Sequence, residues 1–160
     1  MDRYITEELP GLVAELAHVD TTRVGITGHS MGGHGALTLA MKNPGQFRSV
    51  SAFAPISALS QLPWGKIALD AYRGDDPDSF ALFDAAACMR SHGWNADILV
   101  DQGQDDPFLD EHLRPELLAD AASEAGIELM LRMQPGYDHS YWFVASFMAD
   151  HINWHASRLQ

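Results

Sequence analysis

The stretch Gly28-His29-Ser30-Met31-Gly32 decides the fold prediction. A run rich in β-formers at 23–27 precedes it and a helical run at 31–42 follows it, so Ser30 is predicted on a sharp turn between a strand and a helix. The flanking glycines would remove Cβ atoms that clash where the helix folds back over the strand. Such a turn holds a serine hydroxyl at a helix N-terminus, where developing negative charge is favoured, and points the Met31 backbone N–H at that charge. The alternatives are a glycine-rich turn without chemistry and a phosphate-binding loop. The loop is disfavoured because no Lys-Ser or Lys-Thr follows the glycines.

The rest of the chain alternates between strand and helix patterns. We predict strands at 23–27, 47–54, 96–100 and 127–133, and helices at 4–16, 31–42, 109–125 and 140–154. Residues 56–95 are predicted to form an irregular excursion between strands, with two or three short helices, inside a single domain that spans 1–160. The alternation indicates an α/β fold, a parallel sheet with flanking helices, in which ligands bind at the C-terminal ends of the strands.

A serine nucleophile needs a base, and the base needs an acid that orients it. In the hydrolases that carry their serine in a G-x-S-x-G turn of this kind, the chain order is serine, then acid, then histidine. Asp105 and Asp106 both follow the strand at 96–100. We prefer Asp106, because it lies at the apex of the loop before an apolar return to the next helix. Asp101 is closer to the strand itself and is expected to be structural.

His139 is the predicted base, because it is the only histidine between the last strand and the last helix. His29 and His34 flank Ser30 too closely in sequence to reach its side chain and are expected to shape the turn. His112 falls within the predicted helix at 109–125. Four more are expected on helices or on a turn of the excursion, away from the strand tips: His18, His92, His151 and His155. No H-E-x-x-H or comparable ligand spacing and no cysteine pair is present, so no metal site is predicted.

The composition is that of an ordinary soluble protein of 160 residues, with 46% hydrophobic and 20% charged residues. A formal net charge of −12 argues against nucleic acid and anionic membranes as partners, and no apolar run is long enough to cross a bilayer. Cys88 is the only cysteine, so no internal disulfide is possible, and we expect it to be a small packing residue. No signal-peptide layout is present at the N-terminus, and a cytoplasmic location is the default.

Five aromatic side chains could line a pocket or pack in the core: Trp64, Trp94, Tyr137, Tyr141 and Trp142.

Segments along nearly the whole chain resemble, in order, S-formylglutathione hydrolases of the esterase D type. They are Tyr4-Ile5-Thr6-Glu7-Glu8-Leu9-Pro10, Gly28-His29-Ser30-Met31-Gly32-Gly33-His34-Gly35-Ala36-Leu37, Ser51-Ala52-Phe53-Ala54-Pro55, Pro63-Trp64-Gly65, Asp101-Gln102-Gly103 with Asp106, Phe108 and Leu109, Arg114-Pro115-Glu116-Leu117, and Gly136-Tyr137-Asp138-His139-Ser140-Tyr141. This ordered set is far more specific than the serine pentapeptide, which many esterase families share.

The resemblance implies an α/β-hydrolase fold and the triad Ser30, Asp106 and His139, which agrees with the choice made from the residues. It also implies hydrolysis of the thioester S-formylglutathione to glutathione and formate, a step in formaldehyde detoxification, with no cofactor and no metal. Such enzymes also resemble general esterases that cleave small acyl esters. The alternatives are therefore a small-acyl carboxylesterase and a non-catalytic fragment that keeps the triad.

The chain departs from the family in length. The resemblance implies strands that precede the helix at 4–16, and we expect this chain to lack them. A loop after one of those strands would carry the second oxyanion donor. The outer edge of the strand at 23–27 is then unpaired, which favours pairing with another chain. We expect a truncated product, a homo-oligomer formed through this edge, or a partner chain that supplies the rest, and an isolated chain that self-associates or is poorly stable.

Overall fold

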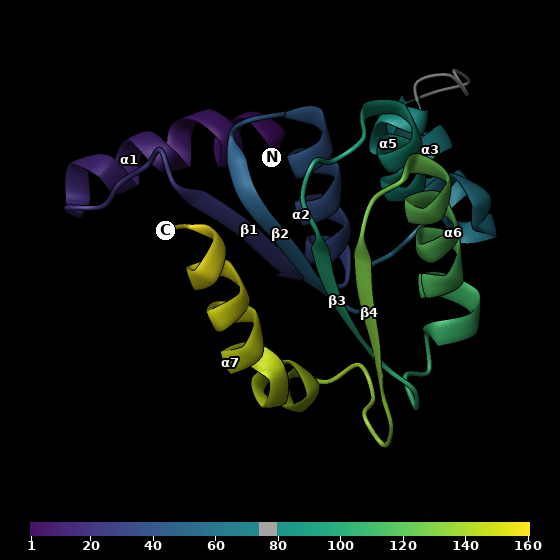
Figure 1. The fold of residues 1–160 in the computed structure, drawn as a ribbon. Coiled ribbons are helices and arrows are strands. Elements are labelled where there is room, and N and C mark those ends of the chain that lie inside the picture. Colours follow the sequence, from purple (N-terminus) through teal and green to yellow (C-terminus); the bar gives the residue numbers. More distant parts are fainter. Residues whose placement is uncertain (74–79) are drawn as a thin grey trace.

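A computed structural model describes residues 1–73 and 80–160, and the part of the predicted excursion at 74–79 lies outside the described residues. The four strands are all parallel and neighbour one another in the order β1-β2-β3-β4 (Figure 1). The elements are a π-helix η1 (Tyr4–Glu8), α1 (Leu9–Leu16), β1 (Val24–His29), α2 (Met31–Lys42), β2 (Phe47–Phe53), a 3-10 helix η2 (Leu59–Gln61), α3 (Pro63–Arg73), a 3-10 helix η3 (Ala81–Phe83), α5 (Ala85–His92), β3 (Ile98–Gly103), a π-helix η4 (Leu109–Leu113), α6 (Pro115–Ala125), β4 (Leu129–Gln134) and α7 (Tyr141–Arg158).

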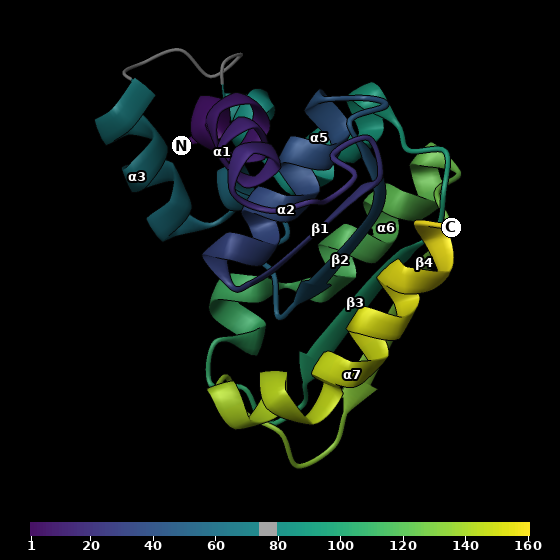
Figure 2. The same cartoon turned by 90° about the vertical axis from the view of Figure 1, so that its left-hand side faces the viewer.

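Helices cover both faces of this sheet. α2 packs against β1 and β2, while α5 packs against both α2 and α6 to complete one layer. α7 lies on the other face, where it contacts β2 and β3, and Figure 2 shows it in front of the strands. The predicted parallel sheet with flanking helices is therefore confirmed.

β3 is buried along its whole length. Ile98, Leu99 and Val100 form a continuous apolar run, which is typical of a parallel strand that is covered on both faces. The larger core cluster lies between the sheet and the layer of α2, α5 and α6, and its members include Leu37, Ala40, Met41, Ala86, Cys88, Met89, Leu118 and Ala122. Complete burial of a side chain such as Leu37 contributes roughly 1.5–3 kcal/mol. Cys88 is fully buried in this cluster, as predicted, and burial raises the pKa of its thiol.

The predicted helix at 109–125 is wrong in one respect, because it is broken in the middle. The π-helix η4 ends at Leu113, Arg114 takes a left-handed conformation with φ 50° and ψ 58°, and α6 begins at Pro115. Proline has no N–H to continue a helix and disfavours helical conformation in the residue before it, so one continuous helix cannot pass through this point. The predicted helix at 4–16 likewise consists of two parts, η1 and α1.

Strand ends also differ from the prediction by a few residues. β1 continues through Gly28 and His29, because these residues still pair with Ala52 and Phe53 of β2. The extension brings the end of the strand directly to Ser30.

Between β2 and β3, the fully buried Asp84 accepts a hydrogen bond from the N–H of Ala87 at the start of α5.

Candidate active site

Ser30 stands between the last residue of β1 and the first residue of α2, as predicted. Its backbone has φ 57° and ψ −118°, a conformation that residues with a Cβ rarely adopt and that surrounding structure must hold in place. Two hydrogen bonds do so. The Ser30 N–H donates to the carbonyl of Phe53 at 2.9 Å, and the Ser30 carbonyl accepts from the N–H of His34 at 3.0 Å.

The two glycines of the pentapeptide differ in importance. A Cβ on Gly28 would lie 2.2 Å from the carbonyl oxygen of Gly32 and 2.8 Å from the nitrogen of Gly33, so Gly28 permits the close return of α2 over β1. A Cβ on Gly32 would meet nothing within 4 Å. The prediction that both flanking glycines prevent a clash is therefore right for Gly28 and wrong for Gly32, because Gly32 contributes its backbone to the contact rather than its missing side chain.

Met31 is the first residue of α2, and its side chain is exposed. Within the described part of the chain its backbone N–H donates to no acceptor. The first N–H groups of a helix have no partner inside the helix and carry partial positive charge. The Met31 N–H is thus free to bind an anionic oxygen beside Ser30.

Asp106 and His139, the predicted acid and base, lie in contact. The Nδ1 of His139 lies 2.6 Å from the Oδ2 of Asp106, whose side chain is fully buried. The Oδ1 of Asp106 accepts from the backbone N–H of Phe108 at 2.8 Å, and its Oδ2 also accepts from the Nε2 of Gln102 at 3.1 Å. The carboxylate is therefore fixed from three directions, and it fixes the His139 ring in turn.

The two neighbouring acids take other positions. Asp105 is exposed, and its backbone N–H donates to the carbonyl of Tyr137 at 2.9 Å. That bond joins the loop after β3 to the loop that carries His139. Gly103 allows the same approach, because a Cβ there would lie 2.3 Å from the Tyr137 carbonyl. Asp101, expected to be structural, is fully buried beneath α7 and does not contact His139.

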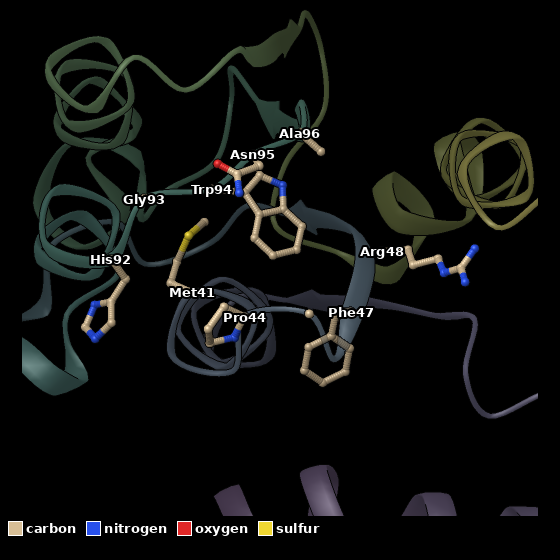
Figure 3. Close-up of a pocket in the computed structure, with 10 residues that line it drawn as sticks. Met41, Pro44, Phe47, Arg48, His92, Gly93, Trp94, Asn95 and Ala96 are labelled. Atoms are coloured by element: carbon tan, nitrogen blue, oxygen red, sulfur yellow. The ribbon is translucent and has the colours of Figure 1, made fainter.

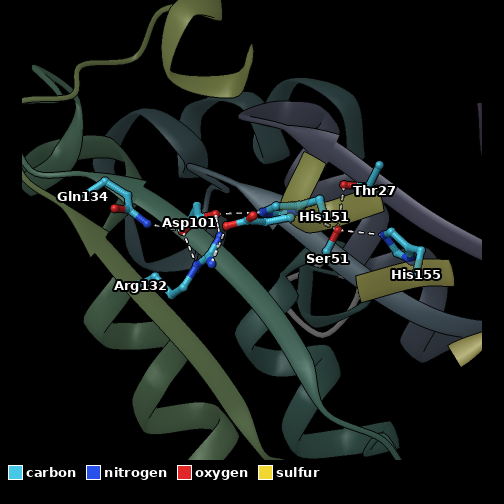
Figure 4. A network of polar contacts seen from close by, with 8 residues as sticks. Thr27, Ser51, Asp101, Arg132, Gln134, His151 and His155 are labelled. Atoms are coloured by element: carbon cyan, nitrogen blue, oxygen red, sulfur yellow. Dashed lines mark hydrogen bonds and ion pairs between the residues drawn. The ribbon is translucent and has the colours of Figure 1, made fainter. Parts of the chain in front are cut away.

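A polar network joins α7 to the sheet (Figure 4). Asp101 accepts from Arg132 and from the Nε2 of Gln134, and its Oδ2 lies 3.0 Å from the Nε2 of His151. Burial raises the pKa of Asp101, but these hydrogen bonds outweigh it and hold that pKa at about 2. The Asp101 carboxylate therefore carries a negative charge that several donors share.

The network continues from His151 toward β1. The Nδ1 of His151 lies 2.8 Å from the Oγ of Ser51, which also donates to Thr27 and lies 2.8 Å from the Nε2 of His155. His151 stacks on Phe53, the last residue of β2, with ring centroids 3.7 Å apart. His151 therefore lies closer to a strand tip than expected, because it stacks on the last residue of β2, whereas His155, farther along α7, reaches Ser49 nearer the start of that strand.

The environment of the His139 ring contains contacts that the sequence did not predict. The His29 ring lies against it with centroids 4.5 Å apart, and the Phe108 ring meets it edge to face at 5.1 Å. The sequence assigned His29 only to the shape of the turn. Ring contacts between residues so far apart in the chain depend on side-chain directions that no local pattern specifies.

Among the described contacts, the Ser30 hydroxyl makes no hydrogen bond to the His139 ring, and catalytic hydrogen bonds are often long when no substrate is bound.

The five aromatic residues divide between core and surface. Trp94 packs against the larger core cluster, and Trp64 and Tyr137 pack against the smaller one. Tyr141 and Trp142 are 80% and 82% exposed at the start of α7. A pocket of about 270 Å³ has a lining that includes Met41, Phe47, His92 and Trp94, and Figure 3 shows these side chains. It lies near the N-terminal ends of β2 and β3, and Ser30 follows the C-terminal end of a strand, so this pocket is not part of the Ser30 site.

Neither a metal cluster nor a membrane-spanning helix is found where the structure is described. In residues 1–73 and 80–160 no three His, Cys, Asp or Glu side chains are grouped so that they could hold a metal ion. Over the same ranges, no helix has the length and apolar character needed to cross a bilayer.

Comparison with known proteins places this site in a family. A protein-family model described as "Putative esterase" matches residues 1–154, and the chain belongs to this esterase family. It is 54% identical over 159 residues to an S-formylglutathione hydrolase of Paracoccus denitrificans and 50% identical over 161 residues to that of Rattus norvegicus. It superposes on an S-formylglutathione hydrolase from Agrobacterium tumefaciens with a TM-score of 0.94 and 47% identity. The predicted resemblance and the α/β-hydrolase fold are confirmed.

The alignments cover nearly all of this chain but a much smaller share of each relative. It includes 99% of this chain but only 57% of each of these three relatives. The chain thus spans little more than half the length of these relatives, although nearly all of its own residues align with them.

Proposed function

We propose that this chain is a serine hydrolase that cleaves S-formylglutathione to glutathione and formate. The observation that carries the proposal is the 2.6 Å contact between His139 and the buried Asp106, in a chain whose strained Ser30 turn leads into a helix N-terminus. The names of the relatives from Paracoccus denitrificans and Rattus norvegicus support the choice of substrate.

In the first half of the proposed reaction the formyl group moves to Ser30. The Ser30 Oγ attacks the formyl carbon while the Nε2 of His139 accepts the hydroxyl proton. Asp106 holds the Nδ1–H tautomer of His139 and stabilises the imidazolium that forms. When the carbon–sulfur bond breaks, His139 returns the proton to the departing sulfur, which leaves as the glutathione thiol.

In the second half, water replaces the thiol. His139 accepts a proton from a water molecule that attacks the formyl ester of Ser30, and it then returns the proton to the Ser30 Oγ as formate leaves. Every proton is handled by His139, so the residues described account for the whole cycle without a cofactor.

Both tetrahedral intermediates carry negative charge on the former carbonyl oxygen. The Met31 N–H at the start of α2 is the proposed donor to this oxyanion. Oxyanion sites of this fold take their second donor from a loop after an early strand, and we assign none here. Loss of one donor costs roughly a hundredfold to a thousandfold in rate, so we expect slow turnover if Met31 acts alone.

A small-acyl carboxylesterase is the second candidate. Two large apolar side chains are exposed close to the site, Met31 beside Ser30 and Tyr141 against the His29 ring. Apolar walls favour short acyl esters without requiring a glutathione-binding surface. This candidate uses the same three residues and differs only in substrate.

The test compares both substrates on one chain. We would measure hydrolysis of S-formylglutathione and of p-nitrophenyl acetate by the wild-type chain, Ser30→Ala and the control Ser91→Ala, whose exposed hydroxyl bonds the Ala87 carbonyl. We expect activity on both substrates, a loss of at least about a thousandfold in Ser30→Ala, and no loss in Ser91→Ala. Activity on the acetate alone supports the carboxylesterase, and a folded chain active on neither contradicts both.

We also propose a cytoplasmic location. A single cysteine, buried and free, is typical of proteins from a reducing compartment.

A further inference from the structure

His29 is the last residue of β1 and the immediate neighbour of Ser30, yet its side chain contacts the other side of the site. Its ring lies 4.5 Å from the His139 ring, centroid to centroid, with 40° between the planes. It also lies 5.7 Å from the Tyr141 ring. Aromatic rings at such separations attract one another beyond the apolar area that they bury.

The polar atoms of His29 do not explain its position. Its Nε2 is buried and has no hydrogen-bond partner among the described residues. Burial lowers the pKa of His29, and the neighbouring His139 lowers it further, against a weaker opposing effect of Asp106. The ring is therefore neutral near pH 7, and a charged ring there would repel the imidazolium that forms on His139.

The His139 ring needs support besides its bond to Asp106. That bond fixes one edge of the ring, at Nδ1, but leaves it able to rock about the bonded atom. Phe108 meets the ring edge to face, although its own side chain is partly exposed. His29 is held more firmly, because its backbone belongs to β1 and pairs with Phe53 of β2.

We propose that His29 is a positioning residue, whose neutral ring packs against His139 and keeps the Nε2 of that base directed at Ser30. The role belongs to the ring and not to its nitrogen atoms. The inference rests on the proposed function only in taking His139 as the base for Ser30, and it does not depend on the substrate.

The first readout is spectroscopic. A histidine Nδ1–H bound to a buried carboxylate gives a proton resonance far downfield, and Asp106→Asn assigns that resonance by removing it. We expect His29→Ala to broaden or abolish the resonance and His29→Phe to retain it. The control His92→Ala, at the end of α5, should leave it unchanged.

The second readout is the rate at which a fluorophosphonate labels Ser30. We expect His29→Ala to slow labelling about 10- to 100-fold, because misplacement of a reacting group by about 1 Å can cost about 100-fold. His29→Phe should label nearly as fast as the wild-type chain. Thermal unfolding of each variant identifies those that fail to fold.

Two outcomes overturn the proposal. One is a folded His29→Ala variant that keeps both the resonance and the labelling rate. The other is a His29→Phe variant that loses both, since the nitrogen atoms rather than the ring would then matter. If His29→Ala does not fold, His29→Phe is compared with His29→Gln instead. A Gln variant that retains the resonance and the labelling rate better than the Phe variant overturns the proposal. The resonance is read without any substrate, so a chain that fails to cleave S-formylglutathione still tests the role of His29.

Discussion

Asp106 differs from Asp105 in the properties that orienting a histidine requires. Its side chain is fully buried and accepts hydrogen bonds from Gln102 and from the Phe108 N–H, whereas the Asp105 side chain is exposed. A buried carboxylate held by several donors keeps one geometry and holds a single tautomer of its partner. Of these two adjacent acids, only Asp106 therefore has the burial and the hydrogen bonds that the proposed role in orienting His139 requires.

The effect of substituting each acid on kcat tests this difference between them. We expect Asp106→Asn to lower kcat for p-nitrophenyl acetate by about 10³- to 10⁴-fold, because the amide favours the wrong tautomer of His139. The matched control Asp105→Asn should stay near wild type. Equal losses in the two variants would contradict the assignment of Asp106.

Gly28 and Gly32 allow a second matched pair. We expect Gly28→Ala to lower the free energy of unfolding by about 1–3 kcal/mol or more, because its Cβ would overlap the carbonyl of Gly32. Gly32→Ala, with open space around its Cβ, should be neutral or stabilising in a helix. Urea unfolding of both variants gives the two values. A Gly28→Ala chain as stable as Gly32→Ala would show that the turn can relax.

The sequence predicted the residues on the strand tips better than the contacts between them. Ser30 and His139 could be placed at strand tips because a strand-to-helix turn and the gap before a last helix are local patterns. The contacts of Gln102 with Asp106, and of His29 with His139, could not be predicted in this way. Both depend on which way side chains point once the sheet has formed, and the sequence pattern carries only the spacing.

Among the elements, α7 is attached to the sheet both by apolar packing of Phe143 on Phe53 and by several polar contacts. Of the 18 residues of the helix only Phe143 and His151 are buried, and His151 and His155 both bond to serines of β2. Arg132 on β4 pairs with Asp101 and with Asp150 of α7. Hydrogen bonds of this kind need fixed protonation states, so the attachment of α7 should depend on pH.

The element-scale prediction concerns His155. Burial, with the nearby His151 and Arg158, lowers the pKa of His155 from 6.5 to about 4. Between these values the unfolded chain binds a proton that the folded chain does not, so the free energy of unfolding should fall as pH drops from 6.5 toward 4. We expect His155→Gln to lose this part of the decline. Urea unfolding at several pH values tests it, and identical slopes for both chains would contradict it.

The elements also limit what sequence patterns can predict. The helix at 109–125 was predicted as one piece because its apolar spacing is continuous, but Pro115 and the left-handed Arg114 divide it. The strand predicted at 96–100 begins two residues too early and ends three too early, because β3 runs Ile98–Gly103 and the polar Asp101 and Gln102 still pair with β4.

At the scale of the whole molecule, the sheet ends on a strand with one unpaired edge. β1 pairs with β2 on one side and, within the described residues, with no strand on the other. α1 buries none of its residues, and the apolar side chains of Leu12 and Leu16 on it are exposed, as is that of Val19 just beyond. An unpaired edge beside exposed apolar residues favours association between chains.

We therefore predict that the isolated chain self-associates. Size-exclusion chromatography with light scattering should show a mass that rises with protein concentration, and the thermal unfolding midpoint should rise with it. The charge-introducing variant Leu16→Lys, at an exposed position on α1, should reduce the association. A monomer at every concentration, with a high unfolding temperature, would contradict this expectation.

The central claim is that Ser30 forms a covalent acyl-enzyme in this chain. The most direct measurement is mass spectrometry of the intact chain quenched during turnover of p-nitrophenyl acetate, followed by peptide mapping. The account predicts one added acetyl group, carried by Ser30, lost on further incubation and absent in Ser30→Ala. A folded chain that gains no acetyl group, or gains it on another residue, would contradict the account.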